Sequence, residues 1–229
     1  MSREHKSFLM RIELMLEKCI FASRWILAPF YIGFFTKKHG AALKFLAALA
    51  CAAGVFFGSA WATDLSDKLQ GGTHLLLMRH AEAPGIGDPP DLSLSDCSSQ
   101  RNLDTRGRDQ AKRIGDWLKS QGVSLARVYS SPWCRCTETA TLLDLGAVEV
   151  QPALGSFFNQ VQHANKSTAA LQALVARTLP SSNSQALILV THQVNIRDYV
   201  GVTVDSGEMV LAHVDHLGRV LSWQRYRSP

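Results

Sequence analysis

Two short apolar runs constrain the fold of this 229-residue chain more than any other feature of its sequence. Residues 74–79 (HLLLMR) and 186–191 (ALILVT) are almost continuously apolar, a pattern typical of strands buried on both faces of a parallel sheet. His80 follows the first run directly, and His192 follows the second. Because ligands bind at the carboxyl edge of open α/β sheets, we expect both histidines at one site on that edge.

Strand and helix signals alternate along the chain from residue 63 onward. The predicted helices cover residues 103–122, 131–146 and 167–179, and the other predicted strands cover residues 126–131, 148–154, 208–215 and 220–226. The middle helix is expected to have Ser131 as its N-cap, Pro132 in its first turn and Gly146 at its end. This alternation predicts an α/β fold, a three-layer sandwich with helices on both faces of a mostly parallel sheet. The last two strands predict a closing hairpin.

Two arginines are expected beside the histidines. Arg79 immediately precedes His80, and Arg135 falls in the first turn of the predicted middle helix. Free N–H groups and the macrodipole at a helix N-terminus favour anions, and a guanidinium group binds phosphate oxygens in a fork. The sequence therefore predicts a cationic cup for a phosphate group, formed by Arg79, His80, Arg135 and His192.

The motifs of other phosphate chemistries are missing from the sequence. It has no P-loop and no spacing typical of metal ligands. Neither Cys134 nor Cys136 begins a Cys-x5-Arg motif, because positions 140 and 142 hold Ala and Leu. We therefore predict that the site uses neither a metal nor a cofactor.

The net charge of +5 does not indicate a nucleic-acid partner. Residues 1–62 carry eight Lys and Arg against three Asp and Glu, whereas residues 63–229 carry sixteen of each. The excess positive charge therefore lies beside apolar N-terminal segments, where it is typical of membrane topology.

These N-terminal segments predict export. Residues 1–36 form an apolar extension that is either a membrane segment or a start-site artefact, and residues 37–62 have the three parts of a secretory signal. The domain at 63–229 is expected in the periplasm. It is either cleaved from the signal after Ala62 or anchored to the inner membrane through residues 19–62.

Four ordered motifs carry a family resemblance. They are RHAE at 79–82, L-x-x-x-G-x-x-Q-A (Leu103, Gly107, Gln110, Ala111), SSPWCRCTETA at 130–140 and VTHQVNIR at 190–197. In this order they resemble branch one of the histidine phosphatase superfamily, the phosphoglycerate mutase-like proteins. Separately, residues 10–35 resemble the start of a family of small uncharacterised bacterial inner-membrane proteins.

The resemblance to the histidine phosphatases implies a phosphoglycerate mutase-like fold and a metal-independent phosphatase. It implies that His80 attacks phosphorus and forms a phosphohistidine, while Arg79, Arg135 and His192 bind the phosphoryl oxygens. The expected substrate is a small phosphate ester such as a sugar phosphate or a lipopolysaccharide-core phosphate. A phosphomutase of the same family and a non-catalytic phosphate-binding protein are the alternatives.

The proton donor for the leaving oxygen is not evident from this resemblance. Family phosphatases usually supply a carboxylic acid after the third strand, where this chain has Ser156, and they often have glycine where it has Ala81. The candidate acids are Glu208, which we expect near the strand that precedes His192, and Glu82, which is equally suited to holding the pocket arginines. Asp88, Asp91 or no acid at all are the remaining alternatives.

The long segment at 83–101 is rich in Pro, Gly, Asp and Ser and is expected to be a functional loop. Arg101 and Asn102 close it and are candidate substrate contacts. In an exported protein, Cys97 is expected to form a disulfide with either Cys134 or Cys136, with three unpaired cysteines as the alternative.

Overall fold

The computed structural model describes residues 63–179 and 185–229. The expected extension at 1–36 and signal at 37–62 lie outside the described residues, as does the resemblance of residues 10–35. Among the residues described, no helix is both long and apolar enough to cross a bilayer.

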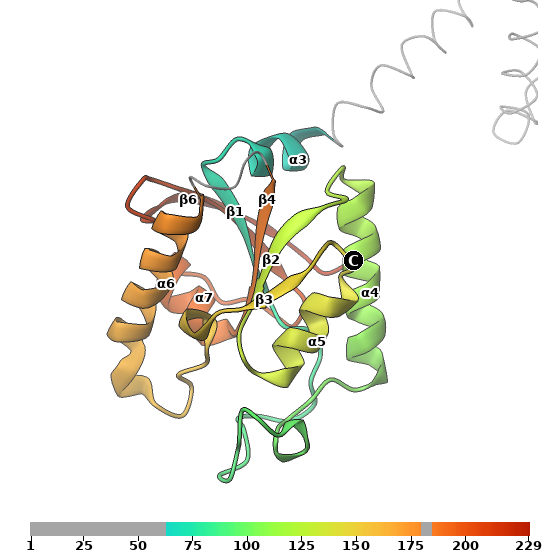
Figure 1. Cartoon of the computed structure of the whole chain (residues 1–229), viewed down its shortest axis with the longest axis vertical. Helices are drawn as coiled ribbons and strands as arrows, with labels where there is room; N and C mark the ends of the chain where they lie inside the picture. The colour runs from blue at the N-terminus through green and yellow to red at the C-terminus, as the bar shows by residue number, and fades with distance from the viewer. Residues whose placement is uncertain (1–62, 180–184) are drawn as a thin grey trace, which may run out of the picture. The chain divides into compact units, whose positions relative to one another are not determined.

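A six-stranded sheet forms the centre of the domain (Figure 1). The strands are β1 (His74–Arg79), β2 (Ala126–Ser130), β3 (Val148–Val150), β4 (Ala186–Thr191), β5 (Met209–Val214) and β6 (Val220–Tyr226), in the order β3-β2-β4-β1-β5-β6. The first four in this order run parallel, and β5 and β6 form the antiparallel hairpin predicted from the sequence.

Helices cover both faces of the sheet. They are α3 (Thr63–Gln70), α4 (Thr105–Ser120), α5 (Cys134–Leu142), α6 (Ala164–Thr178) and α7 (Gln193–Val200). Figure 1 shows α4 and α5 on one side of the sheet and α6 and α7 on the other. Along β1, Leu76 and Met78 pack in the cluster that contains α4 and α5, while Leu75 and Leu77 pack in the cluster with α6 and α7. The three-layer α/β sandwich is therefore confirmed.

The central pairing of β1 with β4 positions the site. Arg79 is in register with Thr191, and the backbone N–H of His80 donates to the carbonyl of Thr191 at 3.0 Å. His80 and His192 therefore leave the sheet side by side, as the apolar runs predicted.

The helix expected at 131–146 is shorter than predicted, because the residues at its two ends have other roles. Ser131 is not its N-cap, and Pro132 is not in its first turn, since α5 begins at Cys134. The N–H of Ser131 extends the sheet by donating to Val190 at 2.9 Å. At the other end, Asp144 and Gly146 adopt positive φ angles of 52° and 140°, which are incompatible with a continuing helix.

Residues at the start of α4 hold the segment that follows β1, at Glu82, through a hydrogen bond and close packing. Asp104 is the N-cap of α4, and its side chain accepts from the N–H of Gly107 at 2.8 Å. Gln110 accepts from the N–H of Glu82 at 2.8 Å and donates to the carbonyl of Ser206 at 2.8 Å. This role explains the glycine and glutamine of the second motif, since both hold the backbone directly after His80.

Gly107 allows a very close approach between α4 and this segment. A Cβ at position 107 would lie 1.9 Å from the carbonyl oxygen of Glu82. We expect Gly107→Ala to lower the free energy of unfolding by about 1–3 kcal/mol, because the backbone has to shift. Gly71→Ala is the control, since its Cβ would meet nothing closer than 3.4 Å. Equal urea midpoints for the two variants would contradict this packing.

Candidate active site

Four predicted residues meet at the carboxyl edge of the sheet. The rings of His80 and His192 have centroids 5.5 Å apart and are inclined at 69°. From the first turn of α5, the guanidinium of Arg135 contacts both rings, at 3.2 Å to Nε2 of His80 and 3.4 Å to Nδ1 of His192. These three residues and Arg79 line one cavity of about 220 Å³. The sequence thus predicted this gathering correctly.

His80 has the protonation state of a nucleophile. Its Nδ1 lies 2.8 Å from the carbonyl oxygen of Ala81 and carries the ring proton, so Nε2 is left with its lone pair. Burial, reinforced by the charge of Arg135, holds the pKa of His80 well below its usual 6.5. The imidazole is therefore neutral at neutral pH, as attack on an electrophile requires.

His192 supports this arrangement from the neighbouring strand. Arg135 donates toward its Nδ1, and its Nε2 lies 2.8 Å from the hydroxyl of Ser131. Burial and then the nearby His80 hold the pKa of His192 well below 6.5. The sequence pattern places Ser131 at a helix cap and does not predict this contact with His192.

Arg79 offers a donor to a ligand. Its Nη1 donates to the carbonyl of Val204 at 2.9 Å. Its buried Nε has no hydrogen-bond partner among the described residues. An anion in the cavity would satisfy this N–H, and that gain is larger for a buried donor than for an exposed one.

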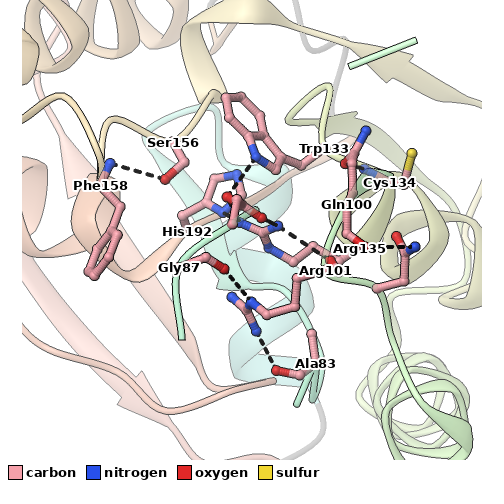
Figure 2. Close-up of polar contacts among 12 residues, drawn as sticks. Ala83, Gly87, Gln100, Arg101, Trp133, Cys134, Arg135, Ser156, Phe158 and His192 are labelled. Carbon is pink, nitrogen blue, oxygen red and sulfur yellow. Dashed lines mark hydrogen bonds and ion pairs between the residues drawn. The ribbon is translucent and has the colours of Figure 1, made fainter. Parts of the chain in front are cut away.

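Asp88 occupies part of the same cavity. Its carboxylate accepts from Nη1 and Nη2 of Arg135 at 2.5 and 3.0 Å, and from the indole N–H of Trp133 at 3.0 Å. The Asp88 and Arg135 side chains are only 8% and 3% exposed. Among the described residues that line the cavity, Asp88 is the only one with a carboxylate. Figure 2 shows Trp133, Arg135 and His192 gathered around this point.

The loop that carries Asp88 is held at both ends. Arg101 donates through Nε to the carbonyl of Gly87 at 2.8 Å and through Nη1 to that of Ala83 (Figure 2). Arg101 also lines the cavity, as expected of a substrate contact. Asn102 does not line it, because its side chain donates to the carbonyl of Cys97 at 2.6 Å. That part of the expectation is not supported.

A disulfide fixes the far end of the loop. It joins Cys97 to Cys134, which is the first residue of α5 and the neighbour of Arg135. Cys136 is buried and outside this bond, and burial raises the pKa of its thiol to about 12. The structure therefore decides between the two pairings left open by the sequence.

The two favoured acids do not line the cavity. The Glu208 carboxylate accepts from the N–H of Asp205 at 2.8 Å and from Nε of Arg225 at 2.9 Å. Although burial opposes them, these hydrogen bonds hold the pKa of Glu208 below its usual value. The geometry therefore argues against Glu208 as a proton donor, since its carboxylate is ionised and turned toward Arg225.

Glu82 has an electrostatic role. Burial lowers the pKa of Arg79 and of Arg101, and the negative charge of Glu82 partly offsets that effect at both. Of the remaining candidates, Asp91 is exposed and outside the cavity, whereas Asp88 lines it. Ser156, which stands where the family usually has its carboxylate, also lines it. Glu82 thus fits the alternative of stabilising the pocket arginines better than that of proton donor.

Comparisons with known proteins support the family that the four motifs resemble. Residues 75–156 match the model of the histidine phosphatase superfamily, branch 1. This match supports the histidine phosphatase superfamily for the part of the chain that carries His80 and Arg135. The mitochondrial serine/threonine-protein phosphatase Pgam5 of Drosophila willistoni is 34% identical over 70 residues, which are 31% of this chain and 21% of that protein. The match therefore spans about a fifth of this curated relative.

Two solved structures share the fold. Mycobacterial hydrolase 1 is 15% identical with a TM-score of 0.51, covering 68% of this chain and 98% of its own. A mycobacterial glucosyl-3-phosphoglycerate phosphatase complexed with VO3 is 15% identical with a TM-score of 0.50, covering 69% and 100%. At this identity the likeness concerns the backbone, and it agrees with the phosphoglycerate mutase-like fold expected from the motifs.

The buried histidines make stability depend on pH. Both are neutral in the folded domain, whereas in the unfolded chain they gain protons as pH falls through 6.5. Below pH 6.5 the unfolded state therefore binds more protons than the folded state. The contribution of the two histidines to the free energy of unfolding is fully present above pH 6.5 and decreases as the pH falls below it.

We expect His192→Gln to flatten this dependence between about pH 5 and 6.5. The measurement is the free energy of urea unfolding in buffers without phosphate. The exposed His163, substituted by Gln, is the control and should leave the slope unchanged. If His192→Gln had the slope of the parent chain, His192 would not be held neutral by burial.

Proposed function

We propose that this histidine phosphatase domain hydrolyses phosphate monoesters through a phosphohistidine on His80. The observation that carries the proposal is the neutral His80 ring, which lies in a cavity lined by Arg79, Arg101 and Arg135 and whose unprotonated Nε2 accepts from Nε of Arg135. A nucleophile surrounded by cationic donors suits transfer of a dianionic phosphoryl group, because positioning and charge stabilisation supply most of its catalysis.

Two displacements on phosphorus complete the reaction. In the first, the lone pair of His80 Nε2 forms the N–P bond while the P–O bond to the alcohol breaks. In the second, water attacks phosphorus, the N–P bond breaks and inorganic phosphate leaves. Arg79 and Arg135 stabilise the charge on the phosphoryl oxygens in both steps, and His192 holds Arg135 through Nδ1.

The expected substrate is a small phosphorylated molecule, such as a sugar phosphate or a lipopolysaccharide-core phosphate. A cavity of about 220 Å³ suits a phosphoryl group with a small adjoining part of the substrate. Ile86 and Phe158 line the cavity and are 92% and 46% exposed, so we expect them to contact the group that carries the phosphate.

Loss of the nucleophile tests the proposal. We expect His80→Ala to lower turnover of 4-nitrophenyl phosphate by at least about 10³-fold, and the exposed control His163→Ala to leave it unchanged. Brief reaction with ³²P-labelled substrate, quenched in alkali, should label the parent chain at His80. Chelators should have no effect, because metal independence is part of the proposal.

Other outcomes separate the alternatives. Hydrolysis that survives His80→Ala would exclude the proposed nucleophile. Phosphate binding without hydrolysis or labelling would favour the non-catalytic binding protein. Transfer of the label to a second position of the substrate, rather than to water, would favour a phosphomutase.

We further propose that the domain is exported to the periplasm. The signal-like segment at 37–62 and the positive charge of residues 1–62 support this proposal, as does the Cys97–Cys134 disulfide, since such bonds persist in oxidising compartments. We expect the mature protein to begin at Thr63, and intact-mass spectrometry of the bacterially expressed chain measures this directly. A mass that includes residues 1–62 would exclude cleavage and leave anchoring to the inner membrane.

A further inference from the structure

The carboxylate of Asp88 occupies the donors that a phosphoryl group would need. It accepts from both terminal nitrogens of Arg135, and the same guanidinium contacts His80 Nε2 through its Nε. A phosphoryl group bound for attack by His80 would also take two parallel hydrogen bonds from those nitrogens. Substrate and Asp88 therefore compete for Arg135.

We propose that the phosphoryl group displaces Asp88 from Arg135, and that Asp88 then donates the proton to the leaving oxygen. This inference rests on the phosphatase function proposed above and assigns the proton donor missing from it. It differs from the sequence expectation, which favoured Glu208 or Glu82.

The loop geometry allows this displacement. Asp88 follows Gly85 and Gly87, whose φ angles are +95° and +71°, and Ile86 between them is 92% exposed. Ile86 therefore has little packing to lose, and the hydrogen bonds that Asp88 has to release come from Arg135 and Trp133. Arg101 donates to the carbonyl of Gly87 and tethers the loop beside the cavity.

In-line attack puts the leaving oxygen on the side of Asp88. His80 Nε2 approaches phosphorus from the end of β1, so the leaving oxygen lies on the opposite side. We place that oxygen against the loop residues Gly85, Ile86, Gly87 and Asp88, which line the cavity. A carboxylic acid on this loop is thus within reach of the oxygen that needs the proton.

The change of partner brings the carboxylate to the substrate. In the free domain it is paired with the guanidinium of Arg135, whereas after displacement it lies beside the phosphoryl group. The proton enters with a monoanionic substrate or from solvent. It then passes to the leaving oxygen as that oxygen receives the electron pair of the broken P–O bond.

The second step restores the starting state. Water attacks the phosphohistidine, its protons leave on inorganic phosphate, and the Asp88 carboxylate, which gave up its proton in the first step, returns to Arg135. The other groups that face Asp88 are cationic or neutral: Arg101 from the same loop, Trp133 before α5, and His80 and His192 at the strand ends. No other described residue of the cavity lining carries a carboxylate that could substitute for it.

Asp88→Asn separates proton donation from binding. The amide keeps an acceptor for Trp133 and Arg135 but has no acidic proton. We expect the variant, in the full chain, to lose about 10²–10⁴-fold in kcat on glycerol 3-phosphate, whose alkoxide needs a proton to leave. On 4-nitrophenyl phosphate, the phenolate leaves without a proton. The kcat of the variant should therefore stay within about threefold of the parent value, a much smaller change than the loss expected on glycerol 3-phosphate.

Asp91→Asn is the matched control. It removes an exposed carboxylate from the same loop and should change neither substrate's turnover. The pH dependence of kcat in the parent chain is a second test, and it does not require that any variant folds. Its kcat on glycerol 3-phosphate should fall with rising pH as one proton is lost, while kcat on 4-nitrophenyl phosphate stays level over the same range.

The outcomes are distinguishable from failure of the phosphatase proposal. If Asp88→Asn lost equal activity on both substrates, or none on glycerol 3-phosphate, or if the two pH profiles of the parent chain were parallel, Asp88 would not be the proton donor. Failure of the parent chain to hydrolyse either substrate would instead overturn the proposed function. Retained turnover of the aryl ester by Asp88→Asn also reports that the variant is folded.

Discussion

The guanidinium of Arg135 is the group on which the rest of the site depends. Its side chain is 3% exposed, and it contacts His80, His192 and Asp88 at once. A buried cation without a partner is strongly destabilising. Asp88 supplies the partner in the free domain, and a phosphoryl group can supply it in a complex. The domain therefore holds a preorganised anion site without leaving a bare charge in its interior.

The surrounding fold fixes Arg135 relative to the two strand ends. Thr139, one turn further along α5, accepts from the N–H of Ala81 at 3.1 Å and donates to the carbonyl of Arg135 at 2.6 Å. Ser131 extends the sheet through its N–H and contacts His192 through its hydroxyl. Cys134 bonds the start of α5 to the loop of Asp88. Because these restraints converge on one helical turn, donors and nucleophile keep a fixed geometry before any ligand binds.

The sequence predicted the parts of this site that follow from strand ends and helix starts. Apolar runs located β1 and β4, so the meeting of His80 with His192 followed from parallel topology. Glu208 shows where such reasoning stops. Its carbonyl does accept from the N–H of Arg79 at 3.1 Å, so it lies at the expected edge, but its side chain turns toward Arg225. Loop residues such as Asp88 follow no period, so only tertiary contacts could place that carboxylate.

An internal carboxylate on Arg135 also affects which anions can bind. Because Asp88 is tethered to the site, it competes at a high effective concentration, and a ligand has to exceed its interactions to displace it. A monoanionic carboxylate ligand reproduces the charge and the two acceptors of Asp88 and gains little by replacing it. A phosphoryl dianion has greater charge and a third oxygen, and the buried Nε of Arg79 is a donor that Asp88 leaves unused. If the proposed function holds, we therefore expect the Asp88–Arg135 ion pair to favour phosphate over carboxylate ligands.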